Sequence, residues 1–288
     1  MIVHVIDGTY ELFRQHFGRP LPGPFGAAIG VMASTVALLE QGATHIGVAS
    51  DHTIESFRND LWAGYKTSEG MPPELTIQIP VMEEALAALG VTVWPMIEFE
   101  ADDALAAAAA VANADPNVTQ VQILTPDKDL GQCVGGKVVQ VDRRNAVTID
   151  ADGVRAKFGV GPASIPDYLG LVGDTADGFP GLAGWGAKSA AAVLAVYEHL
   201  ENVPDAPGQW DVPGLRGAQK LAATLAENRD LAMLFRTIAT VRRDVPVGTV
   251  GEWRWAGPTS TFADTCDQLG ATQLKARVDR LCVQRGLA

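Results

Sequence analysis

Continuous apolar runs alternate with amphipathic patterns over the first half of the chain. Residues 26–41, 73–89 and 101–112 place apolar side chains at helical spacing. Pro80 is expected to bend the second of these helices or to end its first turn. Between the helices lie short apolar runs typical of strands buried on both faces, at 2–6, 46–49, 91–95, 118–125 and 138–141. The alternation predicts an α/β fold with a parallel sheet over residues 1–150.

From about residue 151 the pattern changes to short helices separated by glycine turns. A stretch rich in proline, aspartate and glycine, 202–214, indicates a loop. Helical spacing recurs at 162–172, 188–199, 216–226 and 230–241. We therefore expect a second, helical domain over residues 151–288.

Composition excludes several classes of protein. Of the 288 residues, 47% are hydrophobic and 19% are charged, which excludes intrinsic disorder and coiled coils. Three widely spaced cysteines indicate reduced thiols and neither a disulfide framework nor a zinc knuckle. The longest apolar stretch, 104–112, is well short of the roughly 20 residues of a membrane span, and the N-terminus lacks a signal-peptide pattern. We expect a cytoplasmic protein with no membrane partner.

The net charge argues at first against a nucleic-acid ligand. The chain has 34 acidic and 22 basic residues, a formal net charge of −12, whereas a protein that binds polyanions is expected to be basic. The excess is uneven, because the first 100 residues carry 12 acidic and 4 basic groups and the last 88 carry 10 and 11. The acidity is therefore concentrated in the first two thirds of the chain.

Many of these acidic residues fall at the ends of the predicted strands. Parallel strands bring their carboxyl ends to one edge of a sheet, where binding sites form. Any one of these carboxylates could instead cap a helix or lie in a solvated loop. Seven together would repel one another unless cations bind between them, and oxygen ligands favour Mg²⁺ or Mn²⁺. Two such ions about 4 Å apart are typical of phosphodiester hydrolysis. The seven are Asp7, Asp51, Glu100, Asp102, Asp103, Asp127 and Asp129.

The second half adds Asp174 and Asp177, which one helical turn or a tight turn would aim the same way. A glycine-rich segment at 181–189 follows and opens a helix. Its backbone amides would suit a phosphate group, although such turns are also common as purely structural connections. The preceding aspartates favour a functional interpretation.

Four motifs together resemble those of the bacterial 5′ nucleases. They are E-A-D-D at 100–103, T-P-D-K-D at 125–129, G-D-x-x-D-G-F-P-G at 173–181 and G-W-G-A-K-S at 184–189. That family comprises stand-alone flap endonucleases and the 5′–3′ exonuclease domain of bacterial DNA polymerase I. The resemblance runs from Asp7 to about Asp244, and the chain resembles the stand-alone form because no polymerase domain follows. It implies a PIN-like nuclease core and a helix–three-turn–helix module that binds DNA.

The resemblance implies a role for each acidic residue at a motif position. All nine, the seven above with Asp174 and Asp177, would hold two or three divalent ions that activate a water and stabilise the leaving oxygen. The turn around Gly184, Gly186, Lys188 and Ser189 would grip the duplex backbone, with a K⁺ ion on its carbonyl groups.

Three further residues are implied by the resemblance, and a fourth is a candidate of its own. Arg14 and Lys66 match basic residues of the family and would act as catalytic groups: both would stabilise charge in the transition state, and Lys66 would neutralise charge on the scissile phosphate. Tyr65 would stack on a terminal base. Arg58 is a candidate phosphate contact. The family usually has an arginine where Glu69 stands, within a basic arch, so threading of a 5′ flap is in question here.

The leading hypothesis is a structure-specific 5′ nuclease acting in DNA replication and repair. Its partner would be DNA with a junction of single and double strands, as in flaps, nicks or gaps, or an RNA–DNA hybrid, and we expect a monomer. A paralogue that binds branched DNA with little catalysis is one alternative. A Mg²⁺ phosphatase or receiver-type phosphoryl-transfer domain is another. Without the nine carboxylates, 25 acidic residues face 22 basic ones, so the acidity is mostly that of the predicted metal site.

Overall fold

Contacts between chain segments divide the molecule into two units. The computed structural model describes residues 1–18 and 21–287. Unit 1 comprises Met1–Ile54, Ser68–Thr125 and Arg242–Ala288, and unit 2 comprises Glu55–Thr67 and Pro126–Val241. Both units are therefore assembled from segments that are distant in the sequence.

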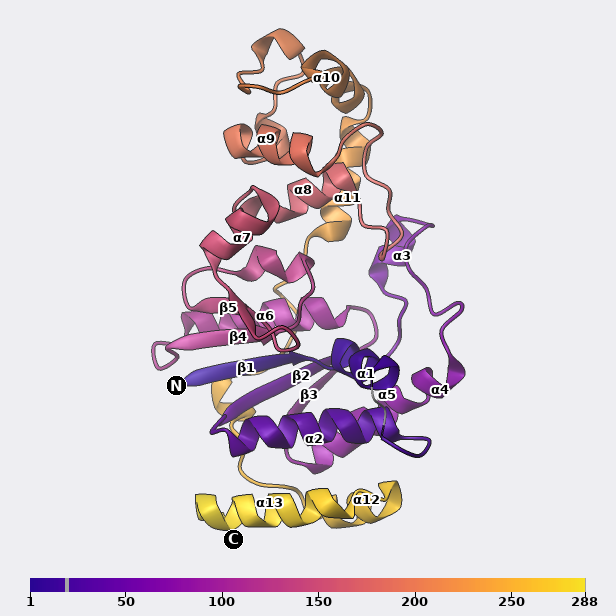
Figure 1. Cartoon of the computed structure of the whole chain (residues 1–288), viewed down its shortest axis with the longest axis vertical. Coiled ribbons are helices and arrows are strands. Elements are labelled where there is room, and N and C mark those ends of the chain that lie inside the picture. The colour runs from indigo at the N-terminus through magenta and orange to yellow at the C-terminus, as the bar shows by residue number, and fades with distance from the viewer. Residues whose placement is uncertain (19–20, 288) are drawn as a thin grey trace. The chain divides into compact units, whose positions relative to one another are not determined.

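Four neighbouring parallel strands run through unit 1 in the order β3–β2–β1–β4. Figure 1 shows α6 on one face of these strands and α2 on the other. Helix α13 contacts α2 and helix α12 contacts α5. The elements of this unit are β1 Ile2–Asp7, α1 Gly8–Phe17, α2 Gly26–Glu40, β2 His45–Asp51, α4 Pro73–Thr76, α5 Gln78–Ala88, β3 Thr92–Met96, α6 Ala101–Ala114, β4 Gln120–Leu124, the 3₁₀ turn η5 Val250–Trp253, α12 Phe262–Leu269 and α13 Thr272–Arg285.

Small residues let the layers of unit 1 approach closely. The alanine-rich helix α6 contacts all four strands and buries most of its alanines completely. At Gly47 in β2, a Cβ atom would lie only 2.0 Å from the indole of Trp94 on β3. Glycine is therefore required at this position for the two strands to pair around the tryptophan.

The predicted helix at 73–89 is two helices with a break at Ile77. Pro80 lies in the first turn of α5, where it has no N–H to donate to the carbonyl of Thr76. Its ring also excludes a regular helix across that carbonyl, because the two lie four residues apart. The expected disruption by Pro80 is thus confirmed, and it falls immediately before α5.

Unit 2 is mainly helical, as its glycine-punctuated sequence predicts. It also holds an antiparallel hairpin of β5 and β6, of which β6 is short and mostly exposed and was not predicted. Its elements are α3 Phe57–Leu61, η1 Asp129–Cys133, β5 Val138–Asp142, β6 Val147–Ile149, α7 Ala151–Phe158, η2 Pro162–Ser164, α8 Ile165–Val172, α9 Ala187–Tyr197, η3 Leu200–Asn202, η4 Pro207–Gln209, α10 Ala218–Glu227 and α11 Arg229–Ala239.

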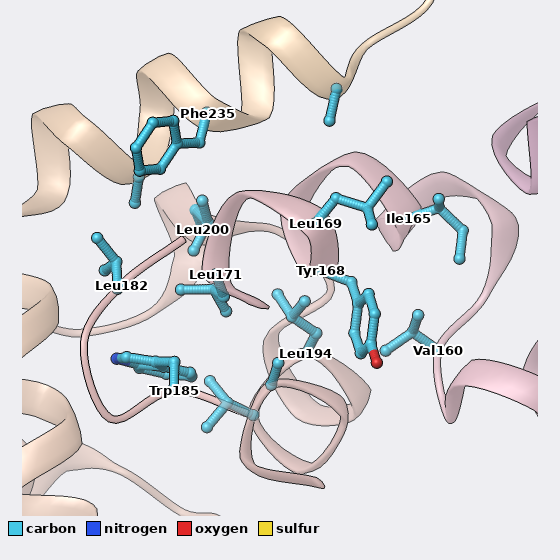
Figure 2. Packing of buried hydrophobic residues seen from close by; sticks show 14 of the residues in the cluster. Val160, Ile165, Tyr168, Leu169, Leu171, Leu182, Trp185, Leu194, Leu200 and Phe235 are labelled. Carbon is cyan, nitrogen blue, oxygen red and sulfur yellow. The ribbon is translucent and has the colours of Figure 1, made fainter. Parts of the chain in front are cut away.

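One apolar cluster holds the helices of unit 2 together. Figure 2 shows side chains of α8, α9 and α11 meeting in it, among them Leu169, Leu194 and Phe235. These three are each at most 1% exposed. Trp185, which belongs to the predicted DNA-binding turn, packs against the same cluster. The core therefore fixes the position of that turn.

The units differ from the expected division at residue 150. Residues 242–288, expected in the helical domain, belong to unit 1, where α13 packs on α2. Residues 55–67 and 126–150 belong to unit 2. The units are defined by contacts in space, whereas the boundary at residue 150 divides two sequence patterns. That boundary stays a prediction. Among the described residues no helix combines the length and the apolar character needed to cross a bilayer.

Candidate functional site

The acidic residues at the strand ends of unit 1 also organise the backbone there. Asp7 is the last residue of β1 and the N-cap of α1, and its Oδ1 accepts the N–H of Tyr10 at 2.8 Å. Its Oδ2 accepts the hydroxyl of Thr125 at 2.9 Å. The side chain is buried and both oxygens are hydrogen-bonded. Asp7 therefore has a structural role whether or not a metal is bound.

A second group surrounds the start of α6. Asp51 ends β2, and its Oδ1 accepts the N–H of Ala101 at 2.8 Å. Glu100 is the N-cap of α6, and Asp102 and Asp103 lie in its first turn. Oδ2 of Asp103 accepts the N–H of Glu100 at 3.0 Å. The strand ends and the helix N-terminus are thus joined at one edge of the sheet, as the motif positions predict.

The acidic residues of unit 2 lie close to one another. The carboxylate oxygens of Asp129, Asp174 and Asp177 lie within 4.8 Å of one another. Oδ1 of Asp127 accepts the N–H of Asp129 at 2.9 Å. Oδ1 of Asp129 is buried, and it has no hydrogen-bond partner among the described residues. A buried carboxylate oxygen without a donor is costly unless a cation or proton satisfies it.

Burial and repulsion determine the charge state of this cluster. Burial raises the pKa of Asp129 well above its usual range, and the carboxylates of Asp127, Asp177 and Asp174 raise it further. Lys128 forms an ion pair with Asp174. Burial opposes the charge of Lys128, but the hydrogen bond to Asp174 and the nearby carboxylates raise its pKa above the usual value. Lys128 compensates part of the negative charge, and Lys66, whose Nζ lies 3.0 Å from Oδ1 of Asp177, compensates a further part.

A tight turn aims Asp174 and Asp177 at Asp129. The N–H of Asp174 donates to the carbonyl of Phe179 at 2.8 Å, and the N–H of Phe179 returns the bond at 3.0 Å. Gly173, which precedes the turn, has φ +80°, and a Cβ there would lie 2.4 Å from the carbonyl carbon of Pro180. Of the two conformations that the spacing allows, the tight turn is the one observed.

The donor set of unit 2 fits a hard divalent cation. Asp129, Asp174 and Asp177 offer carboxylate oxygens, and no histidine or cysteine belongs to the group. Magnesium and manganese prefer such ligands, whereas zinc sites usually contain nitrogen or sulfur. A cation here would also satisfy the orphaned oxygen of Asp129.

Lys66 and Arg14, the two predicted catalytic residues, each lie beside a carboxylate. Lys66 Nζ is 3.0 Å from Oδ1 of Asp177, and the Lys66 N–H donates to the Asp177 carbonyl at 2.9 Å. In unit 1, Arg14 Nη2 is 2.5 Å from Oε2 of Glu11, and its Nε lies 3.3 Å from Oε1 of Glu11. Both cations are partly exposed. Their roles toward a phosphate stay predictions.

Two of the predicted DNA contacts need correction. Arg58 is only 3% exposed, and its Nε donates to the carbonyl of Ile238 at 2.8 Å. Its Nη2 donates to the carbonyl of Thr240 at 3.3 Å, so Arg58 satisfies carbonyls at the end of α11 instead of a phosphate. Tyr65 is 4% exposed and belongs to the apolar cluster of unit 2, which leaves no open ring face for a base.

The glycine-rich turn opens onto a groove, as a DNA-binding role requires. Gly184, Gly186, Lys188 and Ser189 all line a groove of about 720 Å³ within unit 2. The Ser189 hydroxyl accepts the N–H of Gly186 at 3.0 Å and so fixes the start of α9. The structure therefore brings these four residues together, and their contact with DNA stays a prediction.

Sequence reasoning missed the importance of Lys128. This lysine stands between two predicted ligands in T-P-D-K-D, and its ion pair with Asp174 joins the two acidic motifs of unit 2. Its position inside an acidic motif was the available signal. Asn59 was also missed; its side-chain amide donates to the carbonyl of Lys66 at 3.0 Å and steadies that segment.

Comparison with known proteins identifies two successive family models. Residues 2–159 match the 5′–3′ exonuclease N-terminal resolvase-like domain, and residues 160–260 match the 5′–3′ exonuclease C-terminal SAM fold. The first model alone covers more than half of the chain. The predicted parallel α/β core with a C-terminal helical module is thereby confirmed.

Curated relatives agree with these models. DNA polymerase I of Pseudomonas aeruginosa is 35% identical over an alignment of 257 residues, and the match covers 84% of this chain and 27% of that protein. A 5′–3′ exonuclease of Aquifex aeolicus is 32% identical over 208 residues, 70% of this chain and 71% of that protein. The chain thus spans about a quarter of the length of the polymerase relatives that it matches.

Solved structures share the fold over nearly the whole chain. T5 5′-exonuclease with bound zinc ions has a TM-score of 0.67 and 18% identity, with 98% of each chain covered. The catalytic core of Rad2 in complex with DNA substrate has a TM-score of 0.63 and 17% identity, covering 97% of this chain and 92% of that one. At these identities the likeness establishes the fold alone.

Proposed function

The chain belongs to the 5′–3′ exonuclease family, and on that premise we propose that it is a divalent-metal-dependent nuclease that hydrolyses DNA phosphodiester bonds. The observation that carries this proposal is the cluster of Asp129, Asp174 and Asp177 with its buried, unpartnered oxygen. Such a cluster is stabilised by a cation that compensates its charge, and a divalent ion is what phosphodiester hydrolysis requires.

Nine carboxylates are the ligands in this proposal. Two or three Mg²⁺ or Mn²⁺ ions, when bound, supply a water of lowered pKa and neutralise developing charge on the phosphate. In unit 2 the ligands are Asp127, Asp129, Asp174 and Asp177, and in unit 1 they are Asp7, Asp51, Glu100, Asp102 and Asp103. In unit 1 hydrogen bonds to Tyr10, Ala101 and Thr125 hold Asp7 and Asp51 in fixed orientations.

Two side chains of this protein would act on the phosphate directly. Lys66 lies against Asp177 at the edge of the acidic cluster, where its ammonium would contact a phosphate oxygen when DNA binds. Arg14 would supply a second positive charge, with Glu11 orienting its guanidinium. The glycine-rich turn at 184–189 would hold the DNA backbone, with a K⁺ ion on its carbonyl groups.

The substrate in this proposal is DNA with a junction of single and double strands. The T5 flap endonuclease and Rad2 structures contain DNA, which supports this class of partner. Flaps, nicks, gaps and RNA–DNA hybrids are all candidates, and exposed Glu69 argues for weak threading of a 5′ flap. We place the protein as a cytoplasmic monomer that acts in DNA replication and repair.

The test is a cleavage assay on a matched set of 5′-labelled flap, nicked, gapped and RNA-primed duplexes. We expect cleavage with Mg²⁺ or Mn²⁺, none with EDTA, and loss of cleavage in Asp129→Asn. Asp152→Asn is the matched control, because Asp152 is an exposed carboxylate of the same unit outside the cluster. Binding without cleavage by the native chain in either metal would overturn the proposal and favour a non-catalytic binder of branched DNA.

A further inference from the structure

The groove of unit 2 has two walls, and the proposed function uses only one of them. The first wall is the glycine-rich turn that precedes α9. The second wall is another turn, Pro213 to Gly217, followed by the start of α10. Its charged side chains are Arg216 and Lys220. The two walls are separated in the sequence by residues 193–212 and enclose one space of about 720 Å³.

The charge lining this groove is entirely positive. Lys188 comes from the first wall, and Arg216 and Lys220 come from the second. All three are exposed, and none forms an ion pair with a carboxylate within the described part of the chain. No aspartate or glutamate lines the groove. In a chain with a net charge of −12, this local excess selects for an anionic ligand.

The backbone of both walls favours the same ligand. Helix α9 begins after Gly186 and helix α10 begins after Gly217, and neither has an acidic residue in its first turn. The unpaired N–H groups of a helix N-terminus attract anions. At Gly186, Gly214 and Gly217, no atom lies within 4 Å of where a Cβ would stand. A ligand can therefore approach the backbone of both walls closely.

We propose that the second wall, through Arg216 and Lys220, binds the phosphodiester backbone of the same DNA strand that the first wall holds. Each strand of a duplex carries one negative charge per roughly 3.4 Å along the axis, so a groove lined by several cations suits a run of phosphates. The strand is gripped from both sides, and the grip is independent of base sequence. This inference rests on the proposed function only in taking DNA as the ligand.

The test measures DNA binding as a function of salt. The double variant Arg216→Ala/Lys220→Ala is made in an Asp129→Asn background, so that the fluorescein-labelled junction duplex stays intact, and Kd is measured by anisotropy over a KCl series. The slope of log K against log [KCl] is negative, and each lost phosphate contact reduces its magnitude by about 0.9, so the double variant should show a slope shallower by about 1.8. Affinity at about 0.1 M KCl should fall roughly 10- to 60-fold.

Lys157→Ala is the matched control, because Lys157 is an exposed lysine of the same unit outside the groove, and it should leave the slope unchanged. Lys157, Arg216 and Lys220 are exposed, so their substitution should leave the thermal melting of the Asp129→Asn background unaltered. An unchanged salt slope in the double variant overturns the inference. If the native chain, with Asp129 intact, cleaves the duplex, the nuclease proposal survives an unchanged salt slope. If the native chain binds DNA through these residues but never cleaves it, the inference stands and the nuclease proposal falls.

Discussion

The acidic residues of the two units satisfy their charges in different ways. In unit 1, Asp7 and Asp51 accept hydrogen bonds from backbone N–H groups at the starts of α1 and α6. In unit 2, Asp129, Asp174 and Asp177 lie against one another, and one oxygen of Asp129 has no donor among the described residues. Lys128 compensates part of that charge. The same residue type thus stabilises the backbone in one unit and creates electrostatic strain in the other.

This difference separates folding from metal binding. Carboxylates that cap helices stabilise the fold before any metal arrives. Carboxylates that repel one another destabilise the metal-free fold and gain most from a cation. Substitutions in the two groups should therefore change stability in opposite directions, although both should impair a metal-dependent nuclease.

The largest effect is expected on cleavage by Asp129→Asn. A bound metal contributes several kcal/mol to such reactions, at about ten-fold per 1.4 kcal/mol, so the rate should fall roughly 100- to 1000-fold. Single-turnover cleavage of a labelled nicked duplex at saturating Mg²⁺ measures this. A rate within a factor of three of the native protein would show that the unit 2 cluster is not a catalytic metal site.

The next effect in size is a loss of stability in Asp7→Ala. This variant removes the N-cap of α1 and the hydrogen bond from Thr125, and it should lower the free energy of unfolding by about 1–2 kcal/mol. Urea denaturation without metal gives the value. Because both bonds belong to the protein itself, the loss should persist in EDTA. An unchanged midpoint would mean that Asp7 has no structural role.

Asp129→Asn is expected to raise the stability of the metal-free protein, the opposite of the effect of Asp7→Ala. Because burial and its neighbours raise the pKa of Asp129, the folded state binds the proton more tightly than the unfolded state does. The stability of the native protein therefore falls as the pH rises from the usual aspartate value through the raised pKa. The variant escapes this loss, so its Tm should exceed that of the native protein by a few degrees, since about 1 kcal/mol corresponds to roughly 2–4 °C.

A pH series in EDTA tests whether the variant has the higher Tm. The difference in Tm should be largest above the raised pKa and should vanish well below the usual aspartate pKa of about 3.9, where Asp129 is protonated in both states. Added Mg²⁺ should raise the Tm of the native protein above that of the Asp129→Asn variant. A lower Tm for the variant at every pH would contradict the proposed strain.

The smallest effect is expected for Lys128→Ala. Lys128 is about one third exposed, so losing its ion pair with Asp174 should cost about 1 kcal/mol or less in the metal-free protein. The Mg²⁺-induced rise in Tm should grow, because the ion then compensates charge that the lysine carried. A smaller rise would show that Lys128 assists metal binding.

Much of the fold was predictable because hydrophobic runs report burial directly. The runs at 2–6 and 46–49 correspond to β1 and β2, whose interior side chains are fully buried. Strand β6 escaped prediction because Val147–Ile149 is short and largely exposed. Helix α1 escaped prediction because Asp7 ends the strand and caps the helix, which leaves no loop to mark the boundary.

The candidate site was predictable in its residue types but not in its contacts. Arg58 and Tyr65 look like surface groups in sequence, yet each is buried by segments far along the chain. The carbonyls that Arg58 satisfies lie about 180 residues away, at the end of α11. The unpartnered oxygen of Asp129 likewise depends on where Asp174 and Asp177 are placed. Such contacts follow from tertiary packing, which local sequence patterns do not encode.

Anomalous diffraction from crystals soaked in Mn²⁺ tests the metal site directly. We expect an anomalous peak within coordination distance of Asp129 and at least one of Asp174 and Asp177, with the ammonium of Lys128 displaced from Asp174. A manganese-saturated crystal with no peak at these three carboxylates, and with Lys128 still paired to Asp174, would contradict the assignment of this cluster as a metal centre.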